Sequence, residues 1–172
     1  MRKTFSYLLI CLVAALGTPL INAAPAAPIA TVKPPPNIVL LLADDLGFSD
    51  LASYGSEINT PNLSTLARQG VQFSNFHVAA NCAPTRAMLM TGVNNHRAGV
   101  GNIIEMIPDE FLDSPAYQGT LSTNTVTVAT LLRDAGYHTY MAGKWHLGHS
   151  PKLLPSARGY ELSLIHISEP TR

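Results

Sequence analysis

The segment NIVLLLADD, residues 37–45, decides the fold class of this 172-residue chain. Ile38 to Ala43 form an uninterrupted apolar run directly after three prolines, which is typical of a strand buried on both faces of a parallel sheet. Two carboxylates, Asp44 and Asp45, end this run, and Gly47 follows closely. Open α/β sheets hold their ligands at the carboxyl ends of strands, so we expect a functional site here.

Helix and strand patterns alternate after this segment. Thr60, followed by a proline, predicts a helix start with the hydroxyl as N-cap, and Gly70 fits the end of that helix. VQFSNFHV, residues 71–78, alternates loosely between apolar and polar residues and predicts a second strand. A further helix is expected from just after Cys82 to Gly92.

The alternation continues to the end of the chain. Residues 93–123 are rich in glycine, asparagine and proline, which predicts a long irregular loop of the kind that carries function. Thr125 is expected to cap a helix over VTVATLLRDA that ends by Gly136. YHTYMAGKWHLG, residues 137–148, then predicts a strand that runs into a loop. Strands that alternate with helices indicate an α/β architecture.

The N-terminus predicts export. Residues 1–23, MRKTFSYLLICLVAALGTPLINA, combine two basic residues, an apolar run and small residues before the cut, the layout of a cleaved signal peptide. Gly17 and Pro19 interrupt the run, which leaves an uncleaved membrane anchor as the weaker alternative. Residues 24–36 form a Pro/Ala-rich leader. We therefore expect a periplasmic or secreted protein with no stable membrane anchor.

The last residues of the chain, 162–172, read LSLIHISEPTR. They resemble the in-frame translation of a transposon-type sequencing-library adapter, and the alternative is a native amphipathic tail. On the first interpretation they are not native, and only residues 37–161 belong to the catalytic domain.

The composition is that of a globular protein. The chain is 47% hydrophobic and 13% charged, its formal net charge is +0, and it shows no basic patch for nucleic acid. Without residues 1–23 and 162–172, the chain retains 8 basic and 10 acidic residues and a single cysteine, Cys82. An odd cysteine in an exported protein indicates an intermolecular disulfide or a special thiol.

Two short segments carry candidate chemistry, and each leaves a structural alternative open when taken alone. The adjacent carboxylates of Asp44 and Asp45 suit either a hard divalent cation or a solvated turn. Cys82, at a helix start with Arg86 four residues on, suits an anion site around a reactive group. It equally suits a small buried apolar thiol.

A third segment strengthens the functional interpretation. In GKWHLG, residues 143–148, Lys144 and His146 lie two apart beyond a strand, so they form either a cation beside an acid/base group or a surface basic pair. Together, DD, CAPTRAMLMTG at residues 82–92 and GKWHLG closely resemble the sulfatase family, over residues 37–161. The NNHRAGVGN stretch, residues 94–102, is most similar to bacterial arylsulfatases.

This resemblance implies a fold, a reaction and a modification. The fold is alkaline-phosphatase-like, a mixed, largely parallel sheet flanked by helices, and the chain holds its N-terminal part. The activity is hydrolysis of sulfate esters, from an aryl sulfate or a sulfated glycan. A separate formylglycine-generating enzyme oxidises Cys82 to an aldehyde, whose hydrate carries two oxygens on one carbon. One oxygen attacks sulfur and expels the alcohol, and the other then loses its proton to release sulfate.

The resemblance also implies a metal centre. Asp44 and Asp45 match two ligands of a divalent ion, Ca²⁺ more than Mg²⁺, and residue 82 is a further ligand once it is formylglycine. Arg86 matches the arginine that holds the aldehyde hydrate and the carboxylates of the metal site.

The implied sulfate site involves the later segments. Lys144 matches a sulfate-binding lysine, and His146 matches the histidine that takes the proton triggering sulfate release. His96, in the irregular loop just past the cysteine helix, is a further candidate for substrate binding. The second pair of metal ligands, a further histidine and a further lysine come later in the family, so the polypeptide as written is expected to be inactive and poorly folded.

Two alternatives stay open at this point. Some members of the same superfamily are phosphonate or phosphodiester hydrolases that also use formylglycine. A non-catalytic binder of sulfated glycans is the alternative from a different class, although the intact acids, Cys82, Arg86, Lys144 and His146 argue against a decayed site.

Overall fold

The computed structural model describes residues 33–166, and of the last two of these only the backbone. The predicted signal peptide and most of the predicted leader therefore lie outside the described residues, as do residues 167–172. The chain divides into two units, Met1–Leu40 and Leu41–Arg172. In the first unit, residues 33–40 are extended and exposed. No helix in the described part of the chain has the length and apolar content needed to cross a membrane.

The second unit contains all the regular elements of the described residues. The α-helices are α1 (Pro61–Gln69), α2 (Cys82–Thr91) and α3 (Val128–Asp134), and the strands are β1 (Tyr140–Lys144) and β2 (Leu162–His166). Four short 3₁₀ turns complete the set: η1 (Ala52–Tyr54), η2 (Ile104–Met106), η3 (Asp109–Phe111) and η4 (Pro155–Arg158).

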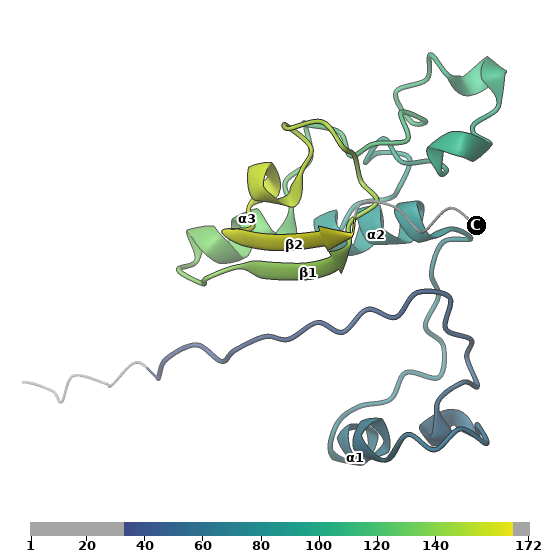
Figure 1. Cartoon of the computed structure of the whole chain (residues 1–172), viewed down its shortest axis with the longest axis vertical. Helices are drawn as coiled ribbons and strands as arrows, with labels where there is room; N and C mark the ends of the chain where they lie inside the picture. Colours follow the sequence, from purple (N-terminus) through teal and green to yellow (C-terminus); the bar gives the residue numbers. More distant parts are fainter. Residues whose placement is uncertain (1–32, 167–172) are drawn as a thin grey trace, which may run out of the picture. The chain divides into compact units, whose positions relative to one another are not determined.

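The sheet of the described region is parallel, as predicted. Tyr140 pairs with Leu162 and Lys144 with His166, so β1 and β2 run side by side in the same direction (Figure 1). The connection between them, residues 145–161, has the length that a parallel crossover requires. The first five of the 11 residues of the adapter-like segment form β2, and the foreign origin of this segment stays a prediction.

The core lies between α2 and the segment that follows β1. Its largest buried side chains are Trp145, Leu147, Leu121 and Val100, which are at most 2% exposed. Ala83, Ala87 and Met90 present one face of α2 to this cluster. Because small alanines allow close approach, the helix packs tightly against the chain that leaves β1.

The two strands predicted before α2 are wrong. Residues 38–43 and 71–78 are extended coil without strand pairing in the described chain. Val39 is 81% exposed and Val71 is 80% exposed. A strand is stable only with a hydrogen-bonded neighbour and a covered face, and residues 33–166 provide neither for these segments.

Two helix caps also differ from the prediction. Thr60 precedes α1, but its hydroxyl accepts a hydrogen bond from the Ala52 amide at 3.1 Å instead of capping the helix. Thr127, not Thr125, caps α3, where its Oγ1 accepts from the Thr130 amide at 3.2 Å. The Thr125 hydroxyl donates to the Ser122 carbonyl at 2.7 Å, so this residue ends the preceding loop.

The other predicted elements are confirmed. The helix after Cys82 ends at Gly92, whose φ of 68° is the left-handed conformation that glycine adopts without strain. Gly70 ends α1 with an extended backbone, and its amide donates to the Leu66 carbonyl. Residues 93–123 are irregular apart from η2 and η3.

Candidate active site

The helix α2 places Cys82 at its first turn. Asn81 has an extended backbone and is the N-cap position, but its side chain makes no capping hydrogen bond. The buried face of α2 packs in the core, which holds the helix start in a fixed place. Cys82 itself is partly exposed, and it is a free thiol. The sulfur marks the position of whatever group the Cβ of residue 82 carries.

The end of β1 places two further side chains. Trp145 and Leu147 are buried in the core at 2% and 0% exposure, so the residues that alternate with them, Lys144 and His146, lie on the other side. His146 has a φ of 57°, an uncommon conformation for a non-glycine residue.

These two segments meet at the cysteine. His146 Nδ1 lies 3.2 Å from Cys82 Sγ, and the Lys144 ammonium donates to the same sulfur at 3.5 Å. His146 and Lys144 lie 64 and 62 positions after Cys82 in the sequence. The prediction that Lys144 and His146 share one side of the chain is therefore confirmed in its geometry.

Asp44 joins the cluster through two cations. The Lys144 ammonium donates to Asp44 Oδ2 at 2.9 Å, and Arg86 Nη2 donates to Oδ1 at 3.3 Å. The hydrogen bond from Lys144 is the main cause that lowers the pKa of Asp44, and Arg86 contributes, while partial burial opposes both. The carboxylate of Asp44 is consequently held ionised.

Arg86 ties the three segments together. Its side chain is 8% exposed, and Nη1 donates to the Lys144 carbonyl at 2.7 Å while Nη2 binds Asp44. Its Nε is buried without a hydrogen-bond partner among the described residues. A buried unpaired donor costs free energy, which makes this atom a place where a further acceptor is favourable.

The cluster offers the type of ligand that a divalent cation prefers, but too few of them among the described residues. Carboxylates such as those of Asp44 and Asp45, and an oxygen on residue 82, are the donors that Ca²⁺ and Mg²⁺ prefer. Ca²⁺ requires about six to eight such oxygens, and within residues 33–166 no three His, Cys, Asp or Glu side chains come together as a metal site. Asp45 is exposed, with a φ of 57°. The predicted ligand set therefore stays a prediction.

His96 has a different partner. Its Nε2 lies 3.1 Å from the Tyr117 hydroxyl, and the two rings meet edge to face at 5.2 Å. The ring is exposed on the irregular loop. Its role in substrate binding stays a prediction.

Two residues of the site region were missed by the sequence prediction. Asn81 Nδ2 donates to Asn102 Oδ1 at 2.7 Å, which ties the irregular loop to the residue before Cys82. The position of Asn81 next to the cysteine was a usable signal. Nothing in a single sequence marks Asn102 as its partner 21 residues away.

Arg158 was also missed, and its role is structural. Its side chain donates to the Ser122 and Thr125 carbonyls at 3.0 and 2.8 Å, and the Thr127 hydroxyl donates to the Arg158 carbonyl at 2.5 Å. Burial lowers the pKa of this guanidinium. These contacts join the crossover connection to the start of α3.

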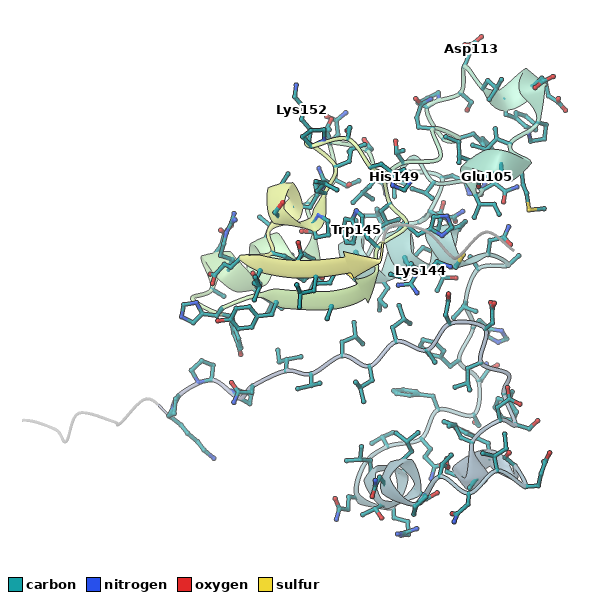
Figure 2. The ribbon with its side chains drawn as sticks, viewed as in Figure 1. Glu105, Asp113, Lys144, Trp145, His149 and Lys152 are labelled. Carbon is teal, nitrogen blue, oxygen red and sulfur yellow. The ribbon has the colours of Figure 1, made fainter. Side chains whose placement is uncertain are left out.

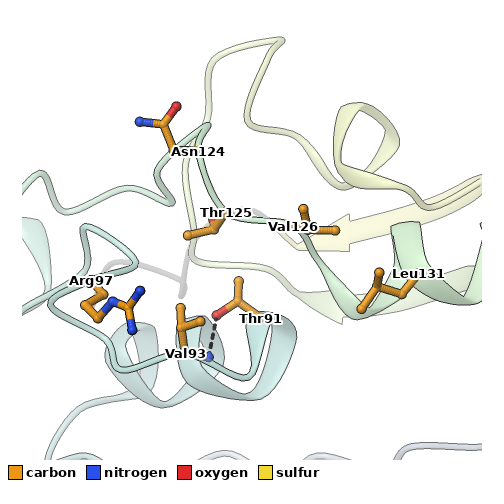
Figure 3. A pocket seen from close by; sticks show the side chains of 7 residues that line it. All are labelled: Thr91, Val93, Arg97, Asn124, Thr125, Val126 and Leu131. Atoms are coloured by element: carbon orange, nitrogen blue, oxygen red, sulfur yellow. Dashed lines mark hydrogen bonds between the residues drawn. The ribbon is translucent and has the colours of Figure 1, made fainter.

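A separate hollow of about 370 Å³ lies near the other end of α2 (Figure 3). The residues that line it come from the end of α2, the loop after it, the segment before α3 and α3 itself: Thr91, Val93, Arg97, Asn124, Thr125, Val126 and Leu131. Thr91 is nine residues after Cys82, about 14 Å along a helix that rises 1.5 Å per residue. This hollow is therefore distinct from the cysteine cluster.

Comparison with known proteins identifies the family. The sulfatase family model matches residues 36–161. An arylsulfatase of Klebsiella aerogenes is 42% identical over 125 residues, which cover 73% of this chain and 26% of that protein. Human arylsulfatase A is 45% identical over 139 residues, which cover 78% of this chain and 26% of that protein. The chain thus spans about a quarter of the length of these relatives.

Solved structures agree with the sequence matches. The crystal structure of Ps i-CgsB superposes with a TM-score of 0.63 at 38% identity and covers 73% of this chain and 27% of that one. A structure of Ps i-CgsB in complex with k-i-k-neocarrahexaose gives a TM-score of 0.58 at 34% identity and covers 69% and 25%. The predicted fold class, α/β of the alkaline-phosphatase-like type, is confirmed. The family model covers well over half of the chain, and the chain belongs to the sulfatase family.

Proposed function

We propose that the complete protein hydrolyses sulfate esters at the cluster around Cys82. One observation carries this proposal: Lys144 and His146 both reach the Cys82 sulfur, within 3.5 and 3.2 Å. A buried structural cysteine needs no such partners, whereas a group that carries out chemistry on an anion requires a cation and an acid/base group beside it. The arylsulfatases among the relatives support the same reaction.

Cys82 is the proposed site of conversion to formylglycine, and the hydrated aldehyde supplies two hydroxyl groups on one carbon. His146 Nδ1, 3.2 Å from the atom on the Cys82 Cβ, is placed to hold or remove a proton there. The imidazole is oriented by the left-handed turn at the end of β1. A histidine suits this task because its ordinary pKa lies close to neutral pH.

Lys144 is the proposed binding group for the sulfate ester. Its ammonium lies between Cys82 Sγ and Asp44, so an oxyanion next to residue 82 meets a fixed positive charge. Arg86, which lies in α2, fixes the positions of the Lys144 backbone and the Asp44 carboxylate relative to this helix. Preorganised positive charge is the largest single contribution in reactions that transfer such anionic groups.

Asp44 and Asp45 would hold a divalent cation, Ca²⁺ or Mg²⁺, whose charge favours the oxyanion of the reacting hydroxyl. The chemistry of the donors supports this, and the remaining ligands would come from sequence beyond the span shared with the relatives. Arg86 stabilises the ionised form of Asp44, which is the form that binds a cation.

The relatives point to two classes of substrate. The relatives are arylsulfatases, and Ps i-CgsB was crystallised with k-i-k-neocarrahexaose, so both an aryl sulfate and a sulfated glycan are candidates. Export to the periplasm or the medium, indicated by residues 1–23, gives access to such extracellular esters.

The test uses the full-length open reading frame that contains residues 37–161, expressed with a formylglycine-generating enzyme. We expect hydrolysis of 4-nitrophenyl sulfate, and a loss of at least about 10⁴-fold in kcat/KM for Cys82→Ala, as for removal of other nucleophiles. A control, Cys11→Ala, lies in the signal segment and leaves activity unchanged. A higher kcat/KM on an aryl phosphodiester than on the aryl sulfate would overturn the proposal in favour of a phosphodiester hydrolase.

A further inference from the structure

His146 has a backbone conformation that needs support from the surrounding structure. Its φ of 57° lies in the left-handed region, which residues other than glycine seldom adopt. Such a conformation persists only where neighbouring contacts determine it. From this conformation the imidazole reaches Cys82, with Nδ1 3.2 Å from Sγ. The contacts that hold the chain around His146 therefore decide whether its ring can act on the group at residue 82.

The backbone is fixed on both sides of His146. Before it, the Lys144 carbonyl accepts a hydrogen bond from Arg86 Nη1 at 2.7 Å. After it, the Leu147 carbonyl accepts one from the Leu121 amide at 2.9 Å, and the Leu147 side chain is fully buried. The short stretch between these two fixed carbonyl groups therefore has few conformations open to it.

Trp145 supplies the largest buried side chain of this stretch. The side chain is 2% exposed, and its indole Nε1 donates to the Leu153 carbonyl at 2.9 Å. The ring meets Tyr160 edge to face, with centroids 6.1 Å apart at an angle of 84°. Figure 2 shows Trp145 between Lys144, at the end of β1, and the loop that carries His149. A tryptophan held by both packing and a hydrogen bond fixes the backbone next to it.

The loop that accepts this hydrogen bond is itself closed. The Leu153 amide donates to the Ser150 carbonyl at 2.8 Å. A Cβ on Gly148 would lie 2.7 Å from the Leu153 side chain, so Leu153 packs directly on the backbone of this glycine, whose φ is 130°. The acceptor of the indole N–H therefore has a fixed position beside the end of β1.

We propose that Trp145 is a positioning residue for the reaction and acts through His146. This inference rests on the proposed function. The buried ring and its hydrogen bond fix the backbone that enters the left-handed turn, and this turn places the imidazole against the group on the Cβ of residue 82. Loss of the Trp145 contacts moves or frees the ring that is to take the proton there.

Lys144 has direct contacts of its own. Its carbonyl binds Arg86, and its ammonium donates to Asp44 Oδ2 at 2.9 Å. These contacts remain when the side chain of Trp145 is changed. A change at Trp145 should therefore lower the rate of proton transfer and leave the binding of sulfate at Lys144 intact.

The first experiment replaces Trp145 in the full-length protein, made with a formylglycine-generating enzyme. Benzothienylalanine keeps the ring volume but has sulfur in place of the indole N–H, and Trp145→Phe also removes one ring. We expect kcat for 4-nitrophenyl sulfate to fall about threefold with the first and about tenfold with the second, because small displacements of a catalytic group have large effects on rate. KM and the inhibition constant of inorganic sulfate should change less than about twofold.

Two outcomes would overturn the inference at this stage. One is an unchanged kcat in both replacements, and the other is a loss of sulfate binding as large as the loss in kcat. If Trp145→Phe does not fold, the benzothienylalanine protein gives the same readouts on its own. The mass of the peptide that contains residue 82 shows the extent of conversion, so that kcat refers to converted protein in each case.

Tyr160→Phe is the matched control. It removes a hydrogen bond from the same core, from the Tyr160 hydroxyl to Met90 Sδ at 3.1 Å, and it keeps the ring that meets Trp145. We expect kcat and KM to stay unchanged in this variant. An equal loss in kcat from Tyr160→Phe and Trp145→Phe would overturn the inference, because it would assign the effect to general loosening of the core.

A double-mutant cycle tests whether Trp145 acts through His146. In a His146→Ala background, Trp145→Phe should lower kcat by less than about twofold, because the group that it positions is already absent. An undiminished loss in this background would overturn the inference. If His146→Ala alone lowers kcat and the Trp145 replacements do not, the proposed function stands and only this inference is wrong. If His146→Ala alone leaves kcat unchanged, the proposed role of His146 is wrong as well.

Discussion

Residues 41–80 and residues 81–161 have similar apolar sequence patterns, but their apolar side chains differ greatly in burial. In the later segment, Ala87, Trp145 and Leu147 are at most 2% exposed and form one core with α2. In the earlier segment, Leu41, Phe73 and Phe76 are between 64% and 74% exposed. Apolar residues become buried only where the chain supplies a facing surface, and residues 81–161 supply their own.

The difference predicts a large change in amide exchange. We expect the amides of residues 38–43 and 71–78 to exchange freely in the 172-residue chain and to be protected at least about 10³-fold in the full-length protein, where further strands pair with them. Hydrogen exchange followed by mass spectrometry measures both forms. Amides of α2 serve as the control, since a helix makes its backbone hydrogen bonds within itself. Slow amide exchange at residues 38–43 in the 172-residue chain would contradict the difference proposed between the two segments.

The second prediction concerns side-chain burial. Trp145→Ala should lower the free energy of unfolding by about 3–5 kcal/mol, because it empties a buried site and frees the Leu153 carbonyl from its hydrogen bond. Phe76→Ala, at a 70% exposed position, should change it by less than about 0.5 kcal/mol in the same chain. Urea denaturation followed by circular dichroism gives both values. Similar losses in the two variants would mean that the two segments share one core.

The third prediction compares the helix starts of the two segments. Thr127→Ala should cost about 1–2 kcal/mol of stability, because it removes the α3 cap and the bond to the Arg158 carbonyl. Thr60→Ala should cost less, since the Thr60 hydroxyl bonds to Ala52 and does not cap α1. Thermal unfolding of both variants tests this order, and the reverse order would show that Thr60 is the true cap.

The smallest expected effect is the acid sensitivity of the Asp44 contacts. The pKa of Asp44 is lowered in the folded chain, chiefly by the hydrogen bond from Lys144. Its contribution to stability is therefore present above the ordinary value of 3.8 and is lost as the pH falls through the lower folded pKa. Asp44→Asn should be less stable than the parent at pH 6 and no less stable near pH 2. A difference that persists at pH 2 would assign the effect to packing.

The helices could be predicted from the sequence because their signals are local. Apolar spacing, Pro61 and Gly92 mark α1 and α2 within a few residues. The predictions of strands at residues 38–43 and 71–78 were wrong because strand formation depends on neighbouring strands, which are not adjacent in the sequence. The N-cap of α3 was misplaced by two residues because Thr125 and Thr127 offer the same hydroxyl, and only the packing of Arg158 distinguishes them.

Most residues of the candidate site could also be predicted from short local segments, and the bond between Asn81 and Asn102 is the exception. The segments that resemble the sulfatase family predicted Asp44, Cys82, Arg86, Lys144 and His146, and direct contacts join all five. The bond between Asn81 and Asn102 was not predictable, because an irregular loop determines which of its polar residues meets the helix. Asp45 was predicted as a metal ligand from its place beside Asp44, and this role stays a prediction.

The most direct test of the central claim is the mass of the tryptic peptide of residues 69–86 from the active full-length protein. Conversion of the Cys82 thiol to an aldehyde lowers that mass by about 18 Da. We expect this loss in protein that hydrolyses 4-nitrophenyl sulfate, and the unmodified mass in inactive protein made without the generating enzyme. A fully unmodified thiol in active protein would contradict the assignment of Cys82 as the precursor of the reacting group.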